Sequence, residues 1–63
     1  MMDMKEIKET SQFLVTEYKD SLMNGFVETP SQFMMRMNVE PKVEEYVRPL
    51  LDQAEQEFKE STK

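Results

Sequence analysis

The residues that decide the fold form one short stretch, Gly25-Phe26-Val27-Glu28-Thr29-Pro30-Ser31-Gln32. Gly25 is the only glycine of the chain, and it follows a long run without glycine or proline. Glycine is common just past the end of a helix because it adopts a positive φ at little cost. Further along, Thr29 offers a hydroxyl N-cap, Pro30 suits the first helical position, and Gln32 completes a capping box. The stretch therefore predicts the end of one helix and the start of another.

Residues 3–24, which precede this stretch, have the apolar spacing of a helix. The apolar side chains recur with a period near 3.6 residues, and they are Met4, Ile7, Leu14, Tyr18 and Leu22. Ser11 stands where a further apolar residue would complete the stripe. Asn24-Gly25 also suits a type I′ hairpin turn, but neither flank alternates and an isolated hairpin is marginal. We predict one helix over residues 3–24.

Two further helices are expected after the capping box, over residues 30–37 and 41–60. Asn38 suits the end of the short helix because asparagine tolerates the left-handed conformation. The apolar stripe of the last helix consists of Val43, Tyr46, Val47, Leu50, Leu51, Ala54 and Phe58. Pro49 lies inside that stripe and either kinks or breaks the helix. The stripe continues in phase past Pro49, which favours a kink.

These features predict an all-α, three-helix domain over residues 1–63, in the order long, short, long. We expect the two long helices to pack antiparallel, with the short helix crossing between them. The expected core is Ile7, Leu14, Tyr18, Leu22, Phe33, Met37, Val43, Val47, Leu50, Ala54 and Phe58.

Composition argues against several classes of function. The chain has 63 residues, with no cysteine and no histidine, so the common metal ligands and the usual general base are missing. We expect no enzymatic activity, no cofactor, no metal and no small-molecule substrate. The 13 acidic and 8 basic residues give a net charge of −5, which disfavours nucleic acid and anionic membranes as partners. With no secretory signal and no long apolar run, the expected location is the cytoplasm.

Residues 31–47 have the rhythm of a helix-turn-helix, which is a DNA-binding motif. The second helix would then lie in the major groove and present Lys42, Glu44, Glu45 and Arg48. Two glutamates that face phosphate are unfavourable. DNA binding is therefore the weakest of the functional interpretations.

Apolar residues are concentrated around the short helix and are the candidate binding site. The chain has 7 methionines, and methionine suits both irregular cores and adaptable protein-binding surfaces. An eight-residue helix cannot bury every apolar side chain on one face. The predicted protein-binding residues are Phe26, Phe33, Met34, Met35 and Met37.

The leading functional hypothesis is a small, non-enzymatic regulator or adaptor that occupies the surface of a partner protein. The alternative is a helical protein that assembles with itself, most simply as a homodimer, because a domain this small has a marginal core. A helix-turn-helix DNA-binding regulator is the third hypothesis.

Overall fold

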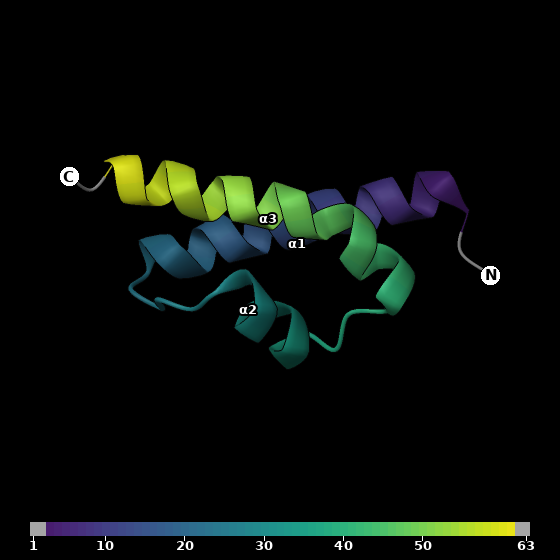
Figure 1. The fold of residues 1–63 in the computed structure, drawn as a ribbon, viewed down its shortest axis with the longest axis horizontal. Coiled ribbons are helices and arrows are strands. Elements are labelled where there is room, and N and C mark those ends of the chain that lie inside the picture. The colour runs from purple at the N-terminus through teal and green to yellow at the C-terminus, as the bar shows by residue number, and fades with distance from the viewer. Residues whose placement is uncertain (1–2, 62–63) are drawn as a thin grey trace.

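The structure, a computed structural model, describes residues 3–61 and contains three helices in that range (Figure 1). They are α1 (Met4–Met23), α2 (Pro30–Arg36) and α3 (Pro41–Ser61). The predicted order of long, short and long helices is confirmed, and the helix ends differ from the predicted ones by a single residue. No strand occurs among the described residues, so Asn24-Gly25 is not a hairpin turn.

α1 ends just before Gly25, as the sequence predicts. Gly25 has a φ of 91° and follows the C-cap residue Asn24. The amide of Phe26 donates to the carbonyl of Ser21 at 2.9 Å, and the amide of Gly25 donates to the carbonyl of Leu22 at 3.2 Å. This pair of hydrogen bonds is a Schellman motif, which satisfies carbonyls that the helix leaves unpaired.

Both ends of α2 also follow from local sequence. The Thr29 hydroxyl accepts from the Gln32 amide at 3.2 Å, and the Gln32 side chain accepts from the Thr29 amide at 3.1 Å. At the other end, Asn38 has a φ of 54°, and the Val39 amide donates to the Met34 carbonyl at 3.1 Å. The predicted capping box and the predicted role of Asn38 are both confirmed.

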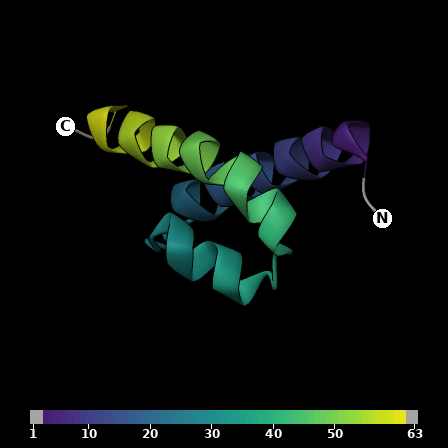
Figure 2. The same cartoon turned by 45° about the vertical axis from the view of Figure 1, so that its right-hand side comes forward.

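The relative direction of the long helices differs from our prediction. The chain runs along α1, returns along α2, and then runs along α3 in the same direction as α1 (Figures 1 and 2). The ion pair between Lys19 and Glu57 accordingly joins the C-terminal halves of α1 and α3. The antiparallel prediction was wrong because α2 reverses the chain once. The first and third helices therefore run in the same general direction, and they cross each other at an angle (Figure 2).

The short helix does not separate the long helices. α1 and α3 pack directly against each other, and α2 packs against α3 on one side of the pair. Figures 1 and 2 show α2 beside the two long helices rather than between them. One face of the α1·α3 pair is therefore covered by α2.

The core lies where the three helices meet. Its buried apolar residues are Leu14, Tyr18, Leu22, Phe33, Met34, Val43, Val47, Leu51 and Ala54. Half-buried side chains pack around them, namely Ile7, Val15, Met37, Val39 and Phe58. The prediction that Leu50 is a core residue was wrong, since Leu50 is 38% exposed and the neighbouring Leu51 is fully buried. Leu50 lies on the edge of α3 that α2 does not cover.

Pro49 does not end α3, which is one helix from Pro41 to Ser61. The first part of α3 runs at an angle to the remainder (Figures 1 and 2), and Pro49 lies inside the helix. The predicted kink is thus confirmed, as expected for a proline that removes one backbone hydrogen bond and clashes with the preceding turn.

In the part of the chain that the structure describes, none of the helices combines the length and the apolar character needed to cross a membrane.

Candidate protein-binding surface

The structure divides the five predicted protein-binding residues between the core and the surface. Phe33 is fully buried and Met34 is 4% exposed, so neither side chain is available to a partner. Phe26 and Met35 are 70% and 83% exposed, and Met37 is half-buried against the core. For Phe33 and Met34, the prediction of a binding surface is therefore wrong.

Phe33 is buried in the core, and two residues contact its ring. The ring of Tyr18 lies 5.1 Å from it in a tilted arrangement, and the guanidinium of Arg36 lies over it at 5.4 Å. Arg36 is itself held by Glu28, at 2.7 Å between Nη2 and Oε1. The hydrogen bonds that Arg36 donates to Glu28 raise the pKa of the Arg36 guanidinium. The inner face of α2 is thus fully used in the fold, and only its outer side remains exposed.

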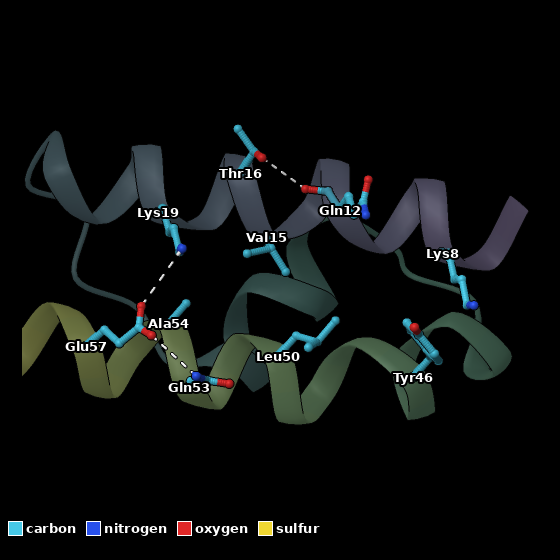
Figure 3. Close-up of a pocket in the computed structure, with 10 residues that line it drawn as sticks. All are labelled: Lys8, Gln12, Val15, Thr16, Lys19, Tyr46, Leu50, Gln53, Ala54 and Glu57. Atoms are coloured by element: carbon cyan, nitrogen blue, oxygen red, sulfur yellow. Dashed lines mark hydrogen bonds and ion pairs between the residues drawn. The ribbon is translucent and has the colours of Figure 1, made fainter. Parts of the chain in front are cut away.

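A groove between α1 and α3 forms a hollow with a volume of about 690 Å³. Figure 3 looks into this groove, with α2 behind it, so the groove lies on the face of the α1·α3 pair that α2 leaves uncovered. Its apolar lining consists of Val15, Tyr46, Leu50 and Ala54. We call this hollow the α1·α3 groove.

Polar side chains border the groove on both helices. The α1 side carries Lys8, Gln12, Thr16 and Lys19, and the α3 side carries Gln53 and Glu57. Glu57 is the only carboxylate of the lining; it accepts from Gln53 at 3.4 Å and pairs with Lys19 at 4.0 Å (Figure 3). Lys8 forms no ion pair with any residue in the range 3–61. The α1 side is therefore basic, although the chain is acidic.

Two smaller hollows share lining residues with the groove, one near each of its ends. Near the start of α1, Tyr46 also lines a hollow of about 260 Å³ that includes Met4 and Ile7. Near the end of α1, Lys19 also lines a hollow of about 340 Å³ that includes Met23. From Met4 to Met23, with a rise of about 1.5 Å per residue, the hollow surface is about 28 Å long.

Sequence reasoning missed this surface, although a signal for it was present. The lining of the groove includes positions 8, 12, 15 and 19 of α1 and positions 46, 50, 53 and 57 of α3. Each set follows the three- and four-residue steps of one helix face. Only the packing of α1 against α3 shows that these two faces form one groove.

Among residues 3–61, no three acidic side chains lie close enough to hold a metal ion. An open, elongated groove with an apolar floor and polar edges is the shape that an amphipathic helix occupies.

The basic residues of the possible helix-turn-helix are largely engaged within the chain. Arg48 pairs with Glu44 one turn earlier, and Arg36 pairs with Glu28. Lys42 and Glu45 border the same hollow near Met4, so no basic patch forms at the start of α3. This arrangement adds no support to the DNA-binding hypothesis.

No family model, no curated protein and no solved structure matches this chain.

Proposed function

We propose that this protein is a small, non-enzymatic protein-binding module whose binding surface is the α1·α3 groove. It acts as a regulator or adaptor by occupying the surface of a partner, without a cofactor and without a small-molecule substrate. Nucleic acid and membranes are not part of this proposal, because the net charge of −5 opposes both. The proposed location is the cytoplasm.

The observation that supports the proposal is the uncovered face of the two long helices. Leu50, which belongs to the apolar stripe of α3, is 38% exposed in the groove, and Val15 and Tyr46 beside it are only half-buried. A domain of this size buries about 60% of the surface of its unfolded chain, so covering this face adds a large fraction to its core. Apolar residues in the centre with charges at the edge are typical of protein interfaces.

A photo-crosslinking residue placed at position 50 tests the proposal in the cells that make the protein. We expect covalent adducts with protein from position 50, because that side chain points into the groove. The matched control is position 35, since Met35 is exposed on α2 and was a predicted binding residue. Adducts from position 35 alone would contradict the proposal and show that the binding surface is on α2. Adducts from neither position would also contradict the proposal.

A further inference from the structure

We propose that a second copy of this chain covers the α1·α3 groove, with the two grooved faces packed together around a two-fold axis that runs along the groove, in the general direction of α1 and α3. This inference rests on the proposed function and names the partner. The product is a four-helix arrangement in which α1 of one copy lies against α3 of the other, while α2 of each copy remains on the outside.

The size of the face agrees with that of a small, specific interface. The hollow surface is about 28 Å long, and two helices packed about 9 Å apart present a face about 20 Å wide. Each copy thus contributes roughly 500–600 Å², which gives about 1,000–1,200 Å² for the pair. That total lies at the lower limit of specific interfaces.

The positions of the charged residues select the direction of the axis. A two-fold axis that runs along the helices places each residue of one copy at the same height along the axis as the same residue of the other copy. Because Lys19 and Glu57 already lie at one height, as their ion pair shows, Lys19 of each copy then meets Glu57 of the other. The four side chains alternate in sign around the bundle, and each lysine lies between two glutamates.

The other way to join the two faces is less favourable. An axis perpendicular to the helices turns one copy end over end and brings α1 against α1. Lys8 of each copy would then approach Lys19 of the other, because the two lysines lie near opposite ends of the groove (Figure 3). Like charges that are brought together at an interface oppose association.

The apolar residues fit the parallel axis as well. Val15 and Leu50 lie opposite each other in the middle of the groove, and Ala54 lies one turn further along α3 (Figure 3). The symmetric copy brings the same three residues to the same heights from the opposite side. They form the apolar centre of the interface. Tyr46 and Lys8 of both copies lie at one end of this centre, and the four alternating charges of Lys19 and Glu57 lie at the other end.

Two charge reversals and their mixture test the proposal. In the purified chain, Lys19→Glu and Glu57→Lys should each raise the dissociation constant of the dimer at least about tenfold, since each variant brings like charges together. An equimolar mixture should regain association near that of the wild type, because the carboxylate introduced at position 19 of one chain meets the ammonium introduced at position 57 of the other. The ion pair within each chain is lost in both variants and stays lost in the mixture. Recovery therefore reports the contact between copies alone.

Sedimentation over a range of protein concentrations measures these constants, and circular dichroism confirms that each variant is folded. Leu50→Glu should also dissociate the dimer, whereas Met35→Glu, on the outer side of α2, should leave it unchanged. A monomeric mass at millimolar concentration, or a mixture that stays monomeric, would overturn the proposal. Tighter association of Lys19→Glu alone would also overturn it, because that result requires the perpendicular axis.

The same measurements separate this inference from the proposed function. If the purified chain is monomeric while position 50 still forms adducts with a different protein in cells, the second copy is wrong and the protein-binding function remains. If the purified chain is monomeric and position 50 forms no adducts, both are wrong.

Discussion

The hydroxyl of Tyr18, in the middle of the core, donates a hydrogen bond of 2.7 Å to the backbone carbonyl of Glu28. Tyr18 belongs to α1, and Glu28 belongs to the segment that leads into α2. The bond therefore attaches the start of α2 to α1, while the Tyr18 ring packs on Phe33. A side chain with no exposed surface thus satisfies its one polar group and fixes the position of the short helix.

Tyr18→Phe should lower the free energy of unfolding at neutral pH by about 0.5–1.5 kcal/mol, the usual net contribution of one hydrogen bond. The ring and its packing on Phe33 remain, so the helical circular dichroism should not change. Chemical denaturation measures the difference. A loss of more than about 3 kcal/mol would mean that the ring has moved as well.

The same tyrosine should make stability depend on alkaline pH. Burial, with smaller contributions from Glu55, Glu28 and Asp52, raises the pKa of Tyr18 from 10.0 to about 12. The folded state thus holds the proton more tightly than the unfolded state does. The resulting stability is fully present below pH 10 and is lost as the pH rises from 10 towards 12, by up to about 3 kcal/mol. Denaturation of the wild type and of Tyr18→Phe at several pH values measures it, and Tyr18→Phe should lack this decrease.

Ser11 should be a site where a substitution stabilises the protein. Its hydroxyl is fully buried and has no hydrogen-bond partner among the described residues. Ser11→Ala removes the unpaired hydroxyl and introduces a better helix former, so the free energy of unfolding should rise by about 1 kcal/mol. Thermal denaturation followed by circular dichroism measures the change. A loss of stability would show that the hydroxyl has a partner in solution.

Thr29→Ala should lower the free energy of unfolding by about 0.5–2 kcal/mol, because it removes the hydroxyl that accepts from the Gln32 amide. Thr29→Ser keeps that acceptor and should be nearly neutral. Denaturant titration of both variants separates the cap from the methyl group of threonine. Equal stability of Thr29→Ala and the wild type would contradict the role of Thr29 as the N-cap.

Gly25→Ala should lower the free energy of unfolding by about 1–2 kcal/mol, since the residue has a φ of 91° and alanine resists the left-handed region. No atom lies within 4 Å of the added Cβ, so the loss is conformational rather than steric. Gly25→Asn should lower the free energy of unfolding by less than Gly25→Ala does. Asn38, which occupies the corresponding position after α2, also has a positive φ. Denaturant titration of the two variants beside the wild type measures both losses. A larger loss for the asparagine variant than for the alanine variant would contradict this explanation.

The helix ends could be predicted from the sequence because each is built by residues close together in the chain. The Schellman motif at Gly25 joins residues no more than five apart, and the capping box joins Thr29 to Gln32, three residues later. Asn38 ends α2 through its own backbone conformation. Such contacts form whatever the helices later pack against, so the sequence by itself determined the number, order and limits of the helices.

The tertiary structure alone decided which faces are covered. Met34 is buried and Leu50 is exposed because α2 folds back over one side of α3 and leaves the other side open. The parallel direction of α1 and α3 has the same origin, since the return along α2 sets it. The packing of these distant segments alone brings Lys8 close to Tyr46 and Lys19 close to Glu57. Helical periodicity specifies which residues share one face of a helix, but it does not specify which other helix packs beside that face. The groove exists only because α1 and α3 pack side by side.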